Sequence, residues 1–220
     1  MWLLGYVPNA ALAGVLLLVA FRITRFELAW QIWRQSRAEF ALIVATALAI
    51  VVLPIETGVA IGILLSLLHG IWTVTRAQVI ALARVKGTSI WWPPGAGSPR
   101  EETKDVLVLA FQAPLSFLNA DSFRRGAVDF VVRAQTPPRL IVLEASSIVE
   151  IDFTAAHALC EVIDFCRGQG IQFAVARLES VRAQNSFRRF GIAGVIGNEH
   201  FYHSVYQAVE ALAPAEAKPE

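Results

Sequence analysis

The sequence predicts a membrane α-helical segment of about three helices, followed by an α/β domain in which helices cover a sheet. Residues 1–21 contain no charged side chain, and residues 57–75 contain none either, whereas charged residues recur throughout the part after residue 104. Hydrophobic residues make up 55% of the 220-residue chain and its mean hydropathy is +0.53, which exceeds the usual composition of a soluble domain. Because this excess lies in the first third of the chain, two unlike parts are expected.

Three apolar stretches are candidates for membrane spans, because about 20 helical residues cross a hydrocarbon core of about 30 Å. They are Trp2–Phe21, Phe40–Leu53 and Gly58–Thr75. Pro54 and Glu56 mark a turn between the second and third stretches, so these two are predicted to form a tight hairpin. No Lys or Arg precedes Ala11-Leu12-Ala13, which argues against a cleaved signal peptide. Three successive runs with hardly any polar face also argue against core helices of a soluble protein.

The loop charges predict the topology. The connection Arg22–Glu39 carries four arginines against two glutamates, the turn at Glu56 has no basic residue, and Arg76, Arg84 and Lys86 follow the third stretch. The positive-inside bias therefore places Glu56 outside and the α/β domain in the cytoplasm, as in a multi-pass protein of a bacterial-type inner membrane.

The first of these loops has an aromatic helical face. Phe26, Trp30 and Trp33 share it, with arginines around them, which is typical of an interfacial helix on the inner leaflet. A packed connector between two spans is an equal alternative.

The domain boundaries follow from composition. Residues 1–86 are predicted to form the membrane segment, 87–104 a linker, 105–213 the α/β domain and 214–220 a disordered tail. The linker contains Trp91-Trp92-Pro93-Pro94-Gly95-Ala96-Gly97-Ser98-Pro99, which is rich in turn-forming residues and has no periodicity.

Strands and helices alternate in the predicted α/β domain. The expected strands are Val106–Phe111, Leu140–Leu143 and Ile171–Ala176, with a short extended piece at Leu115–Leu118. The expected helices are Ala120–Arg133, Asp152–Arg167, Ser180–Phe190 and Glu199–Leu212. Asn119 or Asp121 is expected to cap the first helix. This alternation implies a sheet covered by helices, and about 105 residues suffice for an independent core.

Four motifs together carry a family resemblance. They are Pro8-Asn9-Ala10-Ala11-Leu12-Ala13, Ile55-Glu56-Thr57-Gly58-Val59-Ala60-Ile61-Gly62, Leu118-Asn119-Ala120 and Ile151-Asp152-Phe153-Thr154-Ala155. In this order, the chain resembles the C-terminal part of a SulP-family anion transporter of the sulfate permease type, in which the last membrane helices lead into a cytoplasmic STAS domain. The resemblance implies that the anion site, which lies between broken helices earlier in full-length members, falls outside this sequence.

The loop Glu150–Ala155 is the candidate functional site. STAS domains resemble anti-sigma-factor antagonists, whose Asp-Ser-Ser/Thr-Gly pattern is phosphorylated at the residue after the Asp. Here Asp152 matches, Phe153 occupies the acceptor position, and Thr154 matches the position that follows. Asp152 and Thr154 are therefore the candidate regulatory residues, although both can simply cap the helix that follows.

No catalytic, cofactor-binding or metal site is expected. Glu144, Glu150 and Asp152 have no His or Cys at ligand spacing beside them, and neither a G-x-S-x-G motif nor a glycine-rich phosphate loop is present. The individual histidines and cysteines that could carry chemistry have structural explanations. His157 is expected to be a packing residue on a helix face rather than a base, His200 and His203 to lie on a helix surface, and Cys160 and Cys166 to be buried thiols without a disulfide.

Charge narrows the expected partners. A net charge of +1, without a basic cluster interleaved with aromatic residues, argues against nucleic acid. Arg182, Arg188 and Arg189 form either a solvated helix face or a patch for anionic lipid. Lipid, a second copy or other permease helices, and a cytoplasmic protein are the expected partners.

The leading hypothesis is a partial SulP-type permease, with a regulatory STAS domain that does not catalyse. Transport by this polypeptide alone is not expected, because an ion crossing hydrocarbon needs a polar pathway and these spans offer only Glu56 and His69. The alternative is a membrane-tethered signalling module that acts like an anti-sigma-factor antagonist. The third hypothesis is a small enzyme, which no motif in the sequence supports.

Overall fold

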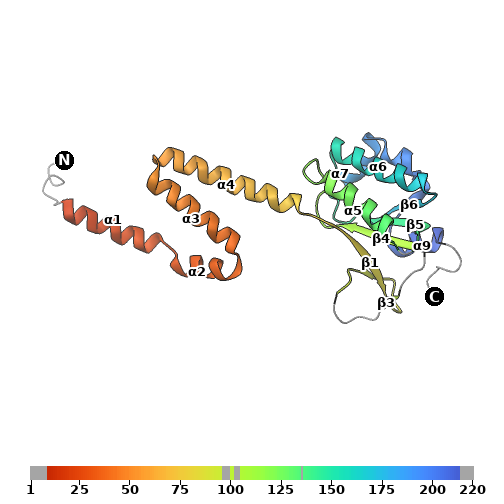
Figure 1. The fold of residues 1–220 in the computed structure, drawn as a ribbon, viewed down its shortest axis with the longest axis horizontal. Coiled ribbons are helices and arrows are strands. Elements are labelled where there is room, and N and C mark those ends of the chain that lie inside the picture. The colour runs from red at the N-terminus through yellow and green to blue at the C-terminus, as the bar shows by residue number, and fades with distance from the viewer. Residues whose placement is uncertain (1–8, 96–99, 102–104, 135, 214–220) are drawn as a thin grey trace. The chain divides into compact units, whose positions relative to one another are not determined.

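The structure is a computed structural model that describes residues 9–95, 100–101, 105–134 and 136–213. The chain divides into two compact units, Met1–His69 and Gly70–Glu220. Figure 1 shows helices in the first unit and a sheet with helices in the second. The predicted tail 214–220 and the first residues of the predicted span Trp2–Phe21 lie outside the described residues.

Helices account for nearly all of the described first unit. They are α1 (Asn9–Ile23), α2 (Phe26–Gln35), α3 (Arg37–Val52) and α4 (Ile55–Thr75), of which α4 continues into the second unit. The Ser36 hydroxyl accepts a hydrogen bond from the Glu39 N–H at 3.4 Å and so caps α3. Pro54 lies between α3 and α4, at the turn that the sequence predicts.

Among the described residues, only α4 has both the length and the apolar composition of a membrane span. The segment Ala10–Ile23 is apolar but shorter, and α3 has 16 residues and begins with Arg37. The predicted set of three spans is therefore not confirmed.

Two glycines allow α3 and α4 to approach each other closely. A Cβ atom added at Gly58 would lie 2.6 Å from the Ile50 Cα, and one added at Gly62 would lie 2.6 Å from a methyl group of Thr46. Both distances are far shorter than van der Waals contact. Gly58-Val59-Ala60-Ile61-Gly62 is thus a G-x-x-x-G sequence used at a helix–helix contact, as is common in membrane helices.

A seven-stranded mixed sheet is the centre of the second unit. Its strands are β1 (Val79–Val85), β2 (Trp91–Trp92), β3 (Arg100–Glu101), β4 (Val106–Phe111), β5 (Leu140–Glu144), β6 (Gln172–Ala176) and β7 (Phe201–Tyr202). The spatial order is β2-β1-β4-β5-β6-β7, and β3 also pairs with β1. Strands β4 to β7 are parallel, whereas β1 is antiparallel to β4, with Val79 opposite Phe111.

Helices cover both faces of this sheet. Side chains from α5 (Ala120–Arg133), α6 (Phe153–Gly168), α7 (Val181–Arg189) and α8 (Ile192–Ile196) join one core cluster, and α9 (Val205–Leu212) joins a second. In β5, Ile141 and Leu143 belong to the larger cluster, while Leu140 and Val142 belong to the other. Because alternate residues of a strand point to opposite faces, a strand buried on both sides reads as one continuous apolar run.

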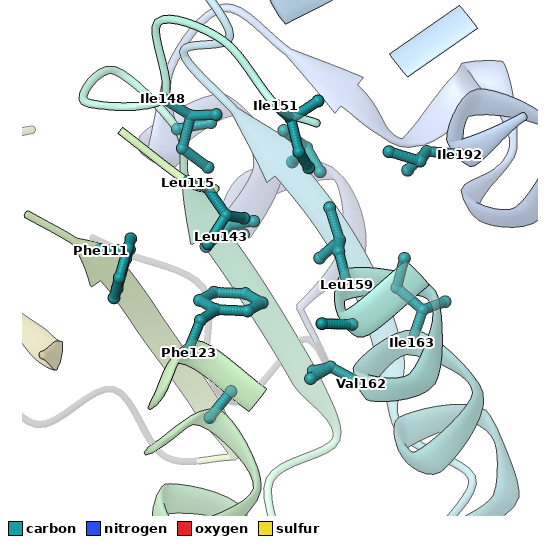
Figure 2. Packing of buried hydrophobic residues seen from close by; sticks show 14 of the residues in the cluster. Phe111, Leu115, Phe123, Leu143, Ile148, Ile151, Leu159, Val162, Ile163 and Ile192 are labelled. Atoms are coloured by element: carbon teal, nitrogen blue, oxygen red, sulfur yellow. The ribbon is translucent and has the colours of Figure 1, made fainter. Parts of the chain in front are cut away.

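The larger cluster contains the bulkiest buried side chains. Figure 2 shows Phe111 and Phe123 beside Leu143, with Leu159 and Ile163 of α6 across from them. The Phe111 and Phe123 rings meet edge to face, with centroids 5.5 Å apart. This cluster fixes α5 and α6 on the sheet, and therefore fixes the loops that precede them.

Three sequence-based boundaries are corrected by the structure. Residues 79–85, inside the range expected for the membrane segment, form β1, and the expected linker 87–104 contributes β2 and β3. Polar residues in Ala83-Arg84-Val85-Lys86 obscure the strand pattern. The helix expected from Glu199 begins only at Val205, since Asn198–His200 form a 3₁₀ turn and β7 pairs with β6 before the Ser204 hydroxyl caps α9.

Candidate functional site

Loops at one edge of the sheet form the candidate site. Since β4, β5 and β6 are parallel, their last residues, Phe111, Glu144 and Ala176, lie at the same edge. Each is followed by a loop that leads into α5, α6 or α7. An isolated bridge pairs Leu115 with Ile151, so the first two loops run side by side. We call this the carboxyl edge of the sheet.

Asp152 joins these two loops through both carboxylate oxygens. Its Oδ1 accepts a hydrogen bond from the Ala155 N–H at 2.8 Å, which caps α6. Its Oδ2 accepts a second bond from the Phe117 N–H, 35 residues away, at 2.6 Å. Backbone donors to a carboxylate are among the stronger protein hydrogen bonds. Asp152 therefore both starts a helix and fixes the neighbouring loop.

Phe153 and Thr154 point to solvent at the start of α6. The Phe153 side chain is 72% exposed and meets the Phe190 ring edge to face, with centroids 6.1 Å apart. Thr154 is also exposed and, among the described residues, its hydroxyl makes no hydrogen bond. The expected cap is thus provided by Asp152, whereas Thr154 lies inside the first turn with its hydroxyl accessible.

Asn119 holds the first loop from within. It is buried, and its Oδ1 accepts a hydrogen bond from the Ser116 N–H at 2.9 Å. Its amide nitrogen donates to the Pro114 carbonyl oxygen, also at 2.9 Å. Asn119 occupies the cap position of α5 without a side-chain capping bond, so its expected role is corrected from helix cap to loop brace.

The three acidic residues singled out from the sequence have separate partners. Glu144 is buried and accepts a hydrogen bond from the Ser146 N–H at 3.3 Å, with the Arg177 guanidinium 3.5 Å away. Glu150 is exposed and pairs with Arg182 at 3.5 Å. No group of three metal-ligating side chains occurs among the described residues. The acidic residues therefore stabilise loops instead of converging on one point.

A pocket of about 440 Å³ opens at the carboxyl edge, and sequence reasoning missed it. Its lining includes Trp91, Gln112, Glu144, Ser146 and Arg177. The Trp91 indole nitrogen is buried there without a hydrogen-bond partner in the described part of the chain. Arg177 has a positive φ of 57°, which is unusual for a residue other than glycine. Nothing in the local sequence signals the buried indole, because its position depends on the pairing of β2 with β1.

A comparison with protein families matches residues 99–208 to the STAS domain. The chain belongs to the STAS domain family. The match begins before β4 and ends within α9, so the carboxyl edge and its loops lie inside it.

Similarity to whole proteins extends beyond the STAS domain. The chain is 30% identical over 210 residues to a protein named "Probable sulfate transporter" of Mycobacterium tuberculosis, covering 96% of this chain and 37% of that protein. It is 24% identical to "Solute carrier family 26 member 10" of Mus musculus, covering 97% of this chain and 33% of that one. The chain thus spans about a third of these relatives, and the predicted resemblance to SulP-type transporters with a STAS domain is confirmed.

Solved structures agree with this fold. The murine Solute Carrier 26 family member A9 anion transporter, in its inward-facing state, matches 92% of this chain with a TM-score of 0.78 and 22% sequence identity. The overall structure of SLC26A9 matches 84% of it with a TM-score of 0.75. At this identity the likeness establishes the fold alone.

The histidines of the STAS domain differ from their predicted places. His157 lies on the exposed side of α6, 3.5 Å from Glu161, so the expectation that it is a packing residue is wrong. His200 ends the 3₁₀ turn and is half-buried, and His203 follows β7, so neither lies on the helix expected there.

The two cysteines of the STAS domain are free thiols, as expected. Cys166 is fully buried in the larger core cluster, and its loss of solvation raises the pKa of the thiol to about 11. Burial also raises the pKa of Cys160, and the nearby Asp164 carboxylate raises that pKa further. Both groups stay protonated near neutral pH, which removes them as nucleophiles.

Proposed function

We propose that this chain provides the last membrane helices and the cytoplasmic regulatory STAS domain of a SulP-type anion permease with a sulfate-like substrate. The observation that carries the proposal is the extent of the sequence alignment, which covers 96% of this chain but only 37% of a relative named as a sulfate transporter. Secondary transport would then be a property of the larger assembly, and this domain would regulate it without catalysing a reaction.

The accessibility of α1, α3 and α4 supports a place in the membrane for these three helices, as three spans. Most apolar side chains of α1, α3 and α4 are exposed, apart from those where α3 meets α4, as expected when lipid or further helices surround these helices. At the end of α4, the Arg76 guanidinium lies over the Trp72 ring, 4.5 Å from its centroid. Paired Trp and Arg are common where a span meets the cytoplasmic headgroups. The STAS domain would then lie in the cytoplasm of a bacterial-type inner membrane.

Transport by this polypeptide alone is not part of the proposal. The predicted spans and the turn between the second and third contain only Glu56 and His69 as side chains that can carry charge near neutral pH. A sulfate-like anion would have to cross hydrocarbon without a polar pathway, which costs several kcal/mol or more. Transport would therefore require contacts with further permease helices or with a second copy of this chain.

Uptake of radiolabelled sulfate into liposomes holding only this polypeptide tests the proposal. We expect uptake no faster than in empty liposomes, while circular dichroism confirms that the inserted protein is folded. Saturable uptake that is competed by unlabelled sulfate would refute the claim that the transport path requires other helices.

The carboxyl edge is proposed as the regulatory site, with Asp152 and Thr154 in different roles. Asp152 holds two loops together through the Phe117 and Ala155 N–H groups, so it positions the site. The exposed Thr154 hydroxyl in the first turn of α6 is accessible to a kinase, and a phosphate there would be favoured by the helix N-terminus. A cytoplasmic protein that binds this edge would be the regulatory partner.

Phosphopeptide mapping and a charge-mimicking variant test this regulatory role. Thr154→Glu is expected to weaken or strengthen binding of the partner protein, while Thr154→Val serves as the uncharged control of similar size. Absence of phosphate on Thr154, together with unchanged partner binding in Thr154→Glu, would remove the hypothesis.

A further inference from the structure

We propose that the pocket at the carboxyl edge binds a small neutral polyol of the size of a mono- or disaccharide. This inference does not depend on the proposed function, because every residue that lines the pocket belongs to the second unit. It also concerns a different surface from Asp152 and Thr154, which lie at the start of α6. The pocket lies on the opposite face of the sheet, the face that α9 covers.

A row of side chains across three neighbouring strands forms the floor of the pocket. Ile80 of β1 lies opposite Ala110 of β4, and Ala110 is paired with Glu144 of β5. Residues in such a row point to the same face of the sheet. The small Ala110 side chain lies between two longer ones and so leaves a hollow. Val205, the first residue of α9, lines this hollow from the side.

The indole of Trp91 presents a buried hydrogen-bond donor in the pocket. Trp91 is paired with Arg84 across β2 and β1, and its ring packs against the core cluster that contains α9. Its Nε1 atom is buried and has no partner in the described part of the chain. A buried donor without an acceptor is destabilising, and buried polar groups almost always have one. An oxygen atom of a ligand would satisfy this donor.

Glu144 presents an acceptor in the same pocket. Its side chain is only 9% exposed, and its Oε1 atom accepts from the Ser146 N–H at 3.3 Å and lies 3.5 Å from the Arg177 guanidinium. Both contacts are made by Oε1, which leaves Oε2 to accept from a donor on a ligand. A hydroxyl group both donates and accepts hydrogen bonds. A ligand with several hydroxyl groups therefore suits both Glu144 and Trp91.

The charges of the lining favour a neutral ligand. Glu144 and Arg177 are the charged residues among the described residues that line the pocket. The Arg177 guanidinium is shared between two carboxylates, because it also pairs with Glu179 at 3.0 Å. It therefore has no spare positive charge for an anion. A cation would find one carboxylate that Arg177 and the Ser146 N–H already engage, so neither sign of charge is selected.

The rest of the lining suits a ring that bears hydroxyl groups. It combines apolar rings with hydroxyl and amide groups, which come from Trp91, Trp92, Pro93, Gln112, Ser146 and Ser147. Hydroxyl and amide side chains both donate and accept hydrogen bonds. A sugar ring has an apolar C–H face and a hydroxyl-bearing edge, and these match the two parts of the lining. The volume of about 440 Å³ falls in the usual range for small-molecule sites.

Tryptophan indole resonances provide the first test. The full chain, isotope-labelled at the tryptophan nitrogens, is held in detergent micelles and titrated with glucose, galactose, mannose, myo-inositol, maltose and sucrose. The Trp91 indole signal is assigned by its loss in Trp91→Phe, and Trp72 of α4, outside the pocket, is the internal control. We expect at least one of these compounds to shift the Trp91 signal with a Kd below about 10 mM and to leave the Trp72 signal in place.

Two matched substitutions test whether the indole N–H makes the contact. Trp91→Phe keeps an aromatic ring and removes the donor, so it should weaken binding of the best probe about fivefold, whereas Trp92→Phe should weaken it less than about twofold. The reason for the difference is that Trp92 is 66% exposed, so water already satisfies its N–H. Saturation-transfer NMR of the probe measures both variants. Equal losses in the two variants would overturn the assignment of the buried donor.

Related compounds test the class of ligand. Cyclohexanol has one hydroxyl group on the same ring size as myo-inositol, and glucuronate adds a negative charge to glucose. Each should bind at least about tenfold more weakly than the best neutral polyol. Tighter binding of cyclohexanol or glucuronate would overturn the choice of a neutral polyol. A Trp91 signal that no compound shifts would show that water alone meets this donor, and would overturn the proposal.

Discussion

The two units of this chain use the same apolar residue types in opposite ways. In the STAS domain, the side chains of Phe111, Phe123 and Leu159 are at most 1% exposed, and they lie in one cluster between the sheet and its helices. In the first unit, Leu17 is 72% exposed and Val51 is 82% exposed. Water drives the first arrangement, since burial of apolar surface is the main favourable term in folding. The second arrangement is stable only where lipid or other helices replace water.

The units also differ in how their elements are joined. In the STAS domain, the side chains of Asp152 and Ser180 bind backbone groups in neighbouring loops, and Asn119 braces its own loop, which fixes the carboxyl edge. In the first unit, close approach at Gly58 and Gly62 joins α3 to α4. Side-chain hydrogen bonds thus fix the loops of one unit, whereas small residues allow the close helix contact in the other.

The largest expected effect is loss of the STAS core. Phe123→Ala should lower the free energy of unfolding of the STAS domain by about 3–5 kcal/mol, because the ring is buried against Phe111 and its removal leaves a cavity. Phe117→Ala, which removes an exposed ring, is the matched control and should change it by about 0.5 kcal/mol or less. Urea denaturation followed by hydrogen exchange in β5 measures both. Similar losses in the two variants would refute the assigned core.

The contact between α3 and α4 should respond next. Gly58→Ala should weaken this hairpin by roughly 1–3 kcal/mol, because the new methyl group would overlap the backbone of Ile50 and force the helices apart. Gly70→Ala is the control, since nothing lies within 4 Å of the corresponding Cβ. Thermal unfolding in detergent micelles compares the two variants. A Gly58→Ala protein as stable as Gly70→Ala would mean that the helices do not pack at this point.

Asp152→Ala tests the brace at the carboxyl edge. It should cost the STAS domain about 1–2 kcal/mol, since it removes the cap of α6 and leaves the Phe117 N–H without its acceptor. Faster amide exchange at Phe117 and Ala155 is expected as well. Thr154→Ala, two residues away, should leave the stability and both exchange rates unchanged. Unaltered exchange at Phe117 in Asp152→Ala would show that the loop is held by other contacts.

The sequence predicts most of the STAS fold because its signals are local. The helix at Ala120–Arg133 and the strand at Val106–Phe111 are found with the predicted bounds, because the hydrophobic periodicity and the turn-forming residues around them agree. Strand β1 was missed because it is antiparallel in the sheet and carries Arg84, which is buried by tertiary packing that no local pattern shows. At the site, Asp152 was found as a cap, but its second bond joins residues 35 positions apart and depends on the fold.

The smallest expected effect near neutral pH concerns Cys166. The pKa of this thiol is about 11 in the folded protein, above the ordinary value of 9.0. The thiol therefore stays protonated to a higher pH in the folded STAS domain than in the unfolded chain. The resulting stability is present below pH 9 and is lost as the pH rises from about 9 to about 11. Cys166→Ala should flatten this part of the pH profile of unfolding, and thiol titration should find Cys166 unreactive in the folded protein. A thiol at this position that reacts at neutral pH would contradict its burial.

Labelling of single cysteines on the two sides of α4 tests most directly whether the two units occupy different media. Glu56→Cys and Arg76→Cys, in a Cys160→Ala, Cys166→Ala background, are exposed to a membrane-impermeant maleimide in intact cells and in inside-out vesicles. We expect Glu56→Cys to be labelled only from outside and Arg76→Cys only from the cytoplasmic side, with Leu64→Cys unlabelled in both. Labelling of Glu56→Cys and Arg76→Cys from the same side would contradict a membrane-spanning α4 that leads into a cytoplasmic STAS domain.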